Sequence, residues 1–146
     1  MPKQLTLLHV EDDPNDTLLL QRACRKAGLV LSVQSANDGD KAVAYLSGTD
    51  EFSQRQTFPL PDLVLLDLKL PRKSGLEVLS WMRAQPKLRR IVVCVFTSSN
   101  HHEDVNNAYD LGANSYLVKP VGFEALVEMI RAINDYWLRV NELPTL

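Results

Sequence analysis

The sequence predicts an α/β fold in which five parallel strands alternate with five helices. Short apolar runs recur along the chain, and a segment with apolar residues at helical spacing follows each of them. The runs at residues 63–66 and 91–96 contain no polar side chain, which is typical of parallel strands covered on both faces. Strands that alternate with helices are joined by right-handed crossovers, so we expect a parallel sheet between two helical layers.

The first strand and helix have clear boundaries. A largely apolar run at residues 5–10 stops at an acidic loop, where Asp13 suits a helix N-cap and Pro14 the first helical position. The helix ends at Gly28, because glycine favours the left-handed conformation just past a helix. His9 lies inside the strand, and we expect its ring to be hydrogen-bonded in the core or at its flank.

The second unit begins with an apolar stretch at residues 29–33. Residues 36–39 lead from it into a helical pattern that contains Ala42, Val43 and Leu46. Residues 48–61 are mostly polar and show neither the helical nor the strand period, so they predict a long surface loop.

The third strand, at residues 63–66, ends in a single carboxylate, Asp67. Ser74 and Glu77 have the spacing of a capping box and predict the start of the third helix. That helix stops before Pro86, because the residue before a proline disfavours the helical conformation.

The fourth strand lies at residues 91–96. Asn100, with Glu103 three residues later, predicts the N-cap of the fourth helix, and Gly112 closes that helix. Residues 115–118 form a short fifth strand.

The last helix follows Lys119 and Pro120. Its apolar residues fall on one stripe: Leu126, Met129, Ile130, Ile133, Trp137 and Val140. Residues 141–146 form a short tail. We therefore expect residues 1–146 to be one domain with no effector domain.

Composition excludes several classes of protein. The chain has 16 Lys and Arg against 18 Asp and Glu, a net charge of −2, so it offers no broad cationic surface for nucleic acid. The longest wholly apolar run, residues 91–96, is too short to cross a membrane. Cys24 and Cys94 are far apart and embedded among apolar residues, so we expect buried, reduced thiols and a cytoplasmic protein.

Polar residues gather where the strands end. The first strand is followed by Glu11 and Asp12, the third by Asp67, the fourth by Thr97 and the fifth by Lys119. In open α/β sheets, ligands bind beyond the carboxyl ends of the strands. Three carboxylates without His or Cys favour Mg²⁺, and a hydroxyl with an ammonium group can hold the oxygens of a phosphoryl group.

These residues stand in motifs that resemble the receiver domain of bacterial response regulators over residues 5–140. The matching motifs are Val10-Glu11-Asp12-Asp13, residues 65–71 with Gly75, Phe96-Thr97-Ser98, and residues 116–120. The resemblance implies the flavodoxin-like doubly wound fold, with sheet order 2-1-3-4-5. It also implies a signalling protein rather than an enzyme, one that catalyses only its own phosphorylation and dephosphorylation.

The resemblance assigns a role to each site residue. Asp67 would accept a phosphoryl group from the phosphohistidine of a sensor histidine kinase, and Thr97 and Lys119 would contact that group. The implied ligands of Mg²⁺ or Mn²⁺ are Glu11, Asp12, Asp67 and the backbone carbonyl of Lys69. Thr97 and Tyr116 would form the conformational switch, and the peptide bond between Lys119 and Pro120 would be cis.

A narrower resemblance, to the single-domain regulators associated with bacterial and cyanobacterial phytochromes, rests on the loop at 48–61 and on residues 136–139 and 143–144. It implies a phytochrome photoreceptor as a partner.

The stripe on the last helix predicts a homodimer through the fourth helix, fifth strand and fifth helix. Lys69 and Ser99 occupy positions that tune hydrolysis in the family; neither suits an attacking water, so we expect a long-lived phosphoryl group.

Two alternatives remain from the residues alone. A haloacid-dehalogenase-like phosphatase also uses a strand-end aspartate, but it requires a second aspartate two residues later, where this chain has Lys69. A receiver-like interaction module that is never phosphorylated would not need all five of the polar residues at the strand ends.

Overall fold

A computed structural model describes residues 4–146 and confirms the predicted fold. One parallel sheet has the order β2-β1-β3-β4-β5. Its strands are β1 (Thr6–Val10), β2 (Ser32–Ala36), β3 (Leu63–Leu66), β4 (Val92–Thr97) and β5 (Ser115–Val118). The helices are α1 (Pro14–Lys26), α2 (Gly39–Ser47), α3 (Gly75–Ala84), α4 (His102–Asp110) and α5 (Phe123–Ile133), with a 3₁₀ turn η1 (Asp50–Phe52) and a π-helical segment η2 (Asn134–Val140).

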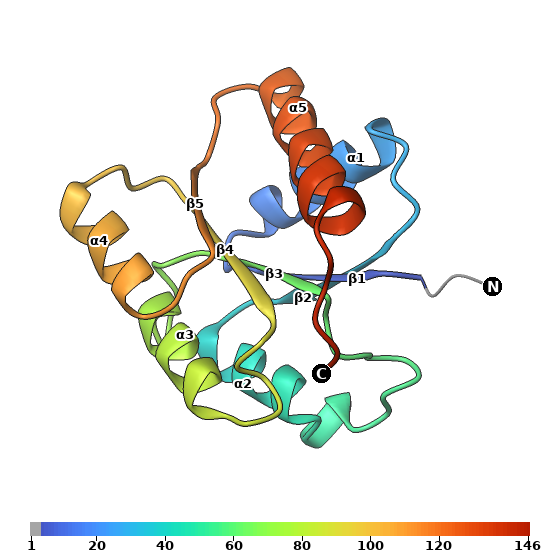
Figure 1. The fold of residues 1–146 in the computed structure, drawn as a ribbon. Coiled ribbons are helices and arrows are strands. Elements are labelled where there is room, and N and C mark those ends of the chain that lie inside the picture. The colour runs from blue at the N-terminus through green and yellow to red at the C-terminus, as the bar shows by residue number, and fades with distance from the viewer. Residues whose placement is uncertain (1–3) are drawn as a thin grey trace.

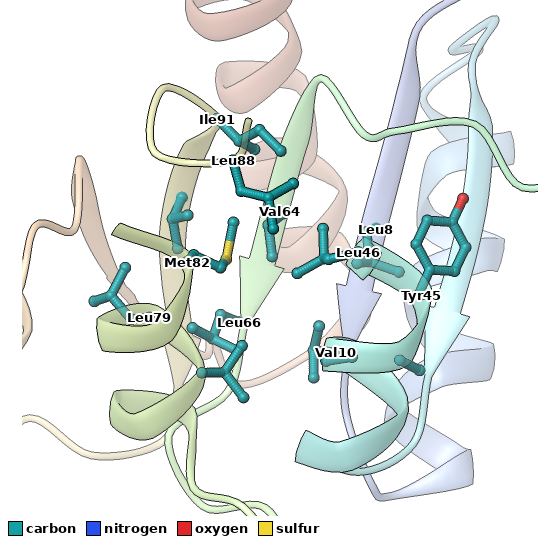
Figure 2. Packing of buried hydrophobic residues seen from close by; sticks show 14 of the residues in the cluster. Leu8, Val10, Tyr45, Leu46, Val64, Leu66, Leu79, Met82, Leu88 and Ile91 are labelled. Atoms are coloured by element: carbon teal, nitrogen blue, oxygen red, sulfur yellow. The ribbon is translucent and has the colours of Figure 1, made fainter. Parts of the chain in front are cut away.

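Helices cover both faces of the sheet. α1 and α5 lie on one face and α2, α3 and α4 on the other (Figure 1). Alternate residues of a strand point to opposite faces, so Leu8 and Val10 join the cluster under α2 and α3, whereas Leu7 joins the cluster under α1 and α5. Figure 2 shows the first cluster, where Val64 and Leu66 of β3 lie beside these β1 residues.

The predicted helix starts are largely confirmed, and they fix the loops that carry the site. The Asp13 side chain caps α1 by accepting a hydrogen bond from Asn15 N at 2.9 Å. Ser74 and Glu77 form the expected capping box of α3. Gly28 adopts a φ of 73°, which allows the chain to turn sharply after α1.

The expected position of the second strand is wrong by three residues. β2 pairs Thr6 with Ser32 and so begins near the end of the apolar stretch at 29–33 and continues to Ala36. Leu29, Leu31 and Val33 are partly buried and pack against the cluster under α1 and α5. Their apolar character therefore reflects packing at the edge of that cluster rather than the bounds of the edge strand.

The predicted N-cap of the fourth helix is also wrong. α4 begins at His102, and its N-cap, His101, makes no side-chain cap. The main-chain N–H of His101 instead donates to the hydroxyl of Ser99, at 3.4 Å. A serine outside the helix thus takes the place of the expected Asn100–Glu103 pair.

The loop at residues 48–61 is more structured than its composition suggests. Phe52 is buried and meets the rings of Tyr45 and Phe58 at centroid distances of 5.1 and 5.2 Å. The Arg55 guanidinium donates to the carbonyl oxygens of Tyr45, Leu46 and Phe58 at 2.8–3.1 Å. Aromatic packing and one arginine therefore fix a segment that has no hydrophobic period.

The apolar stripe of the last helix is directed into the core. Leu126, Ile130 and Ile133 are buried in the cluster that α5 shares with α1. The segment continues as η2, and the tail that follows returns to the body: Leu143 packs against the same cluster, and Arg90 donates to Thr145 O at 3.3 Å. The first part of the stripe therefore faces the core, whereas Val140 at its end is 71% exposed, and the dimer seam stays a prediction.

The predicted cis peptide bond between Lys119 and Pro120 is wrong. The structure has no cis peptide bond among residues 4–146, so this bond is trans. The trans form of a bond before proline is favoured by roughly 0.5–1 kcal/mol. The chain turns instead at Gly122, with a φ of 96°, and Lys119 N donates to Thr97 O at 2.8 Å, which aligns the lysine with the sheet edge.

Both cysteines are buried and unpaired, as predicted. Burial raises the pKa of Cys24 to about 11 and that of Cys94 to about 12, so neither thiol ionises near neutral pH. Within residues 4–146, no helix has the length and apolar character needed to cross a membrane.

Candidate functional site at the carboxyl edge of the sheet

All five polar residues predicted at the strand ends converge on one edge of the sheet. Glu11 follows β1, Asp67 follows β3, Thr97 ends β4, and Lys119 follows β5. The ligand oxygens of Glu11 and Asp67 lie within 4.8 Å of one another and of a carboxylate oxygen of Asp12. Glu11 and Asp67 are buried, whereas Asp12 is exposed, so the cluster has one open side.

Lys119 is the central cation of the site. Its Nζ donates to Glu11 Oε1 at 2.6 Å, to Asp67 Oδ2 at 2.9 Å and to Asp16 Oδ2 at 3.0 Å. The three donors of the ammonium group are thus matched by three carboxylates. The arrangement leaves more negative than positive charge at the edge of the sheet.

The second oxygen of Asp67 is held from the other side. Asp67 Oδ1 accepts a hydrogen bond from Thr97 Oγ1 at 2.9 Å and from Lys69 N at 3.2 Å. Both oxygens of this carboxylate are therefore oriented by donors from three parts of the chain: the end of β4 and the turns after β3 and β5. The turn carrying Lys69 lies beside the acidic cluster, and the role of the Lys69 carbonyl as a ligand stays a prediction.

Gly75 explains how this turn fits. Its N–H donates to Leu68 O at 2.9 Å, and a Cβ at this position would lie 2.1 Å from the carbonyl oxygen of Asp67 and 2.7 Å from Leu68 Cα. Only glycine tolerates so close an approach of two backbones. The start of α3 is therefore packed directly onto the turn after β3.

The charges of the site are unevenly compensated. Burial favours the neutral acid of Asp67, but the hydrogen bond and positive charge of Lys119 outweigh it and hold the pKa of Asp67 below its usual range. Burial raises the pKa of Glu11 to about 7 despite the same lysine. One ammonium group thus stabilises the charge of Asp67 fully and that of Glu11 only in part, and an added hard cation would stabilise both.

The expected switch residues are connected to the site by a second set of hydrogen bonds. Tyr116 Oη donates to Ser99 O at 3.0 Å, and Ser99 Oγ donates to Asp104 Oδ2 at 2.5 Å. Burial raises the pKa of the Tyr116 phenol; the hydrogen bond to Ser99 opposes the rise, and the negative charges of Asp104 and Asp67 add to it. Tyr116 therefore lies within the electrostatic reach of both carboxylates.

Two residues of these networks, Asp16 and Asp104, were not predicted from the sequence. Asp16 lies in the first turn of α1, three residues after the N-cap, and reaches Lys119 across 103 positions of sequence. Asp104 lies in the first turn of α4. The available signal, an acidic residue in a first helical turn, is common, because such residues favour helix starts on any surface.

His9 departs from expectation. It is 1% exposed, as expected of a core residue, yet neither ring nitrogen has a hydrogen-bond partner among residues 4–146. Its ring lies 6.2 Å from that of Phe96. Burial lowers its pKa to about 4, Lys119 adds to the decrease, and Asp67 opposes it, so the ring is neutral at pH 7.

Replacing His9 with Leu is expected to stabilise the chain by about 1 kcal/mol at pH 7.5, because two unsatisfied nitrogens leave the core. The pKa of His9 is lower in the folded chain, so below pH 6.5 the unfolded chain binds a proton that the folded chain does not. The wild type should lose roughly a further 2 kcal/mol by pH 5, a loss absent from H9L. Urea unfolding of both proteins at both pH values measures this; a less stable variant at either pH would contradict it.

Comparison with known proteins places this geometry in a family. The model of the response regulator receiver domain matches residues 7–131. The chain is 39% identical to a probable methanogenesis regulatory protein, FilR2, of Methanothrix harundinacea, over 94% of this chain and 86% of that protein. It is 36% identical to response regulator Rcp1 of Synechocystis, over 98% of this chain and 95% of that protein.

Solved structures agree with these relatives. The phosphorylated cyanobacterial phytochrome response regulator RcpA superposes with a TM-score of 0.90 at 34% identity, covering 98% of this chain and 100% of that chain. The Mn²⁺-bound form of Rcp1 superposes with a TM-score of 0.85 at 35% identity, covering 97% of this chain and 99% of that chain. A family match across most of the sheet, with an acidic cluster at its carboxyl edge, shows that this chain belongs to the response regulator receiver domains of two-component signalling.

Proposed function

We propose that Asp67 accepts a phosphoryl group from the phosphohistidine of a sensor histidine kinase. The observation that carries this proposal is the fixing of both Asp67 oxygens, Oδ2 by Lys119 and Oδ1 by Thr97, beside an acidic cluster. A carboxylate that served only as a turn cap would not need an ammonium group and a hydroxyl that other strands supply. The chain would then catalyse its own modification and no other reaction.

The transfer follows from these contacts. An Asp67 oxygen forms the new O–P bond while the P–N bond to the donor histidine breaks, and the imidazole nitrogen keeps the electron pair. Lys119 and Thr97, which now hold the carboxylate, are close enough to hydrogen-bond the oxygens of the arriving phosphoryl group. Thr97 would move with that group, and Tyr116 would respond as the second switch residue.

A divalent cation completes the site. The ligands we assign to Mg²⁺ or Mn²⁺ are Glu11, Asp12, Asp67 and the backbone carbonyl of Lys69. The donor set fits, because it contains only oxygen atoms and carries more negative charge than Lys119 neutralises. The bound cation would neutralise charge on the phosphoryl oxygens during transfer.

Mass spectrometry of the intact protein tests this function. The chain is incubated with a small acyl phosphate and Mg²⁺, with and without a chelator, and separately with an autophosphorylated histidine kinase. We expect one phosphoryl group, mapped by peptide analysis to Asp67 and absent with the chelator. No label from either donor, under conditions where Mg²⁺ binding is measured directly, would overturn the proposal in favour of an interaction module that is not phosphorylated.

We also propose a phytochrome-type kinase as the partner. The support is the likeness to RcpA and Rcp1 over nearly the whole chain. The chain is about as similar to FilR2, whose name refers to the regulation of methanogenesis. Sequence identity alone therefore does not show which signal the partner kinase senses. Phosphotransfer from a cyanobacterial phytochrome kinase should be faster than from an unrelated histidine kinase; equal rates would contradict this partner.

The phosphoryl group is expected to persist for minutes or longer. Hydrolysis needs a side chain that orients water toward the phosphorus atom, but the single hydrogen of the Ser99 hydroxyl is donated to Asp104. Lys69 is exposed and cationic, and therefore a poor base. The label is followed by mass after the donor is removed by desalting; its loss within seconds would refute this prediction.

We propose that the protein dimerises through α4, β5 and α5. The buried part of the stripe faces the core, so the contact would rest on exposed apolar side chains: Tyr109 of α4, Val118 of β5 and Val140 at the end of the stripe. Light scattering at tens of micromolar should detect a dimer that Tyr109→Asp weakens and Val30→Asp, at the opposite edge of the sheet, leaves intact. A monomer with and without phosphorylation would overturn this interface.

Two further proposals concern the setting of the protein. The unpaired, buried cysteines fit a reducing compartment, so we place it in the cytoplasm. Its net charge of −2 makes a protein rather than nucleic acid its direct partner.

A further inference from the structure

The loop that joins β4 to α4 is fixed at both ends by backbone hydrogen bonds. Lys119 N donates to Thr97 O at 2.8 Å where the loop begins, and Val105 N donates to His101 O at 3.1 Å where the helix begins. Between these two points Ser99, which is 7% exposed, links the loop to α4 through its hydroxyl and to β5 through its carbonyl.

Ser99 makes three hydrogen bonds, to α4, to the N-cap residue of α4 and to β5. Its hydroxyl donates to Asp104 Oδ2 at 2.5 Å and accepts from His101 N at 3.4 Å, and its carbonyl accepts from Tyr116 Oη at 3.0 Å. A hydroxyl has one hydrogen, so its orientation is decided by the acceptor that takes it. That acceptor is a carboxylate, and a hydroxyl that donates to a carboxylate forms a short, charge-assisted bond.

Ser99 and Asp104 could serve only to stabilise the start of α4, because the side chain of the N-cap residue His101 makes no hydrogen bond there. Two features extend the effect beyond the helix. Ser99 lies two residues after Thr97, whose hydroxyl contacts Asp67, and Ser99 also provides the carbonyl that holds Tyr116. A change in the position of Ser99 therefore moves both residues that contact or face the phosphorylation site.

We propose that Asp104 is a positioning residue for phosphoryl transfer: by fixing Ser99 through its hydroxyl, it keeps the Thr97 hydroxyl on Asp67 and the Tyr116 hydroxyl on the main chain at the same time. This inference rests on the proposed function of Asp67. Within residues 4–146, Asp104 makes no hydrogen bond or ion pair with the acceptor or the assigned metal ligands; it acts through Ser99. The effect is one of preorganisation, since the donor that must meet the phosphoryl group is already in place.

Four variants test this role with acyl phosphate and saturating Mg²⁺. Asp104→Ala and Ser99→Ala should each slow the labelling of Asp67 about fivefold, the factor that corresponds to one net hydrogen bond. The double variant should be no slower than either single one, because both remove the same link. Asp104→Asn keeps an acceptor oxygen and should restore most of the rate.

Glu103→Ala is the matched control, because it removes the same charge from the same first turn of α4. Wild-type labelling in Asp104→Ala, equal slowing in Glu103→Ala, or additive slowing in the double variant would each overturn the proposal. If the wild type itself takes no label, the proposed function has failed. Hydrogen exchange of the His101 amide in the unmodified chain then tests whether Asp104 fixes the position of Ser99. Faster exchange in Asp104→Ala supports the positioning role, and unchanged exchange overturns it.

Discussion

Replacing Asp67 with Asn is expected to abolish phosphoryl incorporation and to leave the chain folded. An amide oxygen is too weak a nucleophile to form the O–P bond, so labelling by acyl phosphate should fall by more than about a hundredfold. The amide retains hydrogen-bonding groups for Thr97, and Lys119 keeps Glu11 and Asp16 as partners. We therefore expect the free energy of unfolding to change by no more than about 1 kcal/mol.

Asp12→Asn separates loss of the acceptor from loss of the metal. Asp12 is exposed and belongs to the acidic cluster, so its change should weaken Mg²⁺ binding without removing the nucleophile. Excess Mg²⁺ should restore labelling in Asp12→Asn and have no effect in Asp67→Asn. Labelling of Asp67→Asn at the wild-type rate would show that the phosphoryl group resides on another residue.

The site was predictable because each of its main residues follows a strand that the sequence marks strongly. Unbroken apolar runs locate β3 and β4, and parallel strands must end at a common edge, so Asp67 and Thr97 had to be neighbours. The structure confirms that convergence and the sheet order.

Contacts that depend on side-chain reach were not predictable. Asp16 reaches Lys119 from α1, and Asp104 reaches Ser99 from α4. Neither position differs in sequence from an ordinary acidic first turn. The stripe of α5 is a related case. Helical spacing shows that one face is apolar, but not which part of it meets the chain's own core: Leu126, Ile130 and Ile133 do, whereas Val140 is exposed. β2, an edge strand, gave the least reliable bounds because its side chains are only half buried.

Replacing Lys119 with Met should have the second large effect, on stability as well as on phosphorylation. Methionine fills much of the same volume but leaves Glu11, Asp16 and Asp67 without their common cation. Breaking a buried ion pair from one side costs about 3–5 kcal/mol. We expect about 3 kcal/mol, at the lower end of this range, because the Asp16 side chain is 36% exposed and Glu11, whose pKa is already about 7 beside Lys119, takes up a proton more readily once the ammonium group is gone.

The same argument predicts that Mg²⁺ will stabilise the Lys119→Met protein more than the wild type. Without the ammonium group the carboxylates repel one another, and a divalent cation bound among them relieves that repulsion in the folded chain alone. Urea unfolding with and without Mg²⁺ measures the difference, and labelling by acyl phosphate should stay at least about a hundredfold below wild type even where the metal has restored the fold. Equal stabilisation of both proteins by Mg²⁺ would contradict the charge balance assigned to the site. Full labelling in the refolded variant would instead show that the metal alone neutralises the phosphoryl group and that Lys119 serves only the fold.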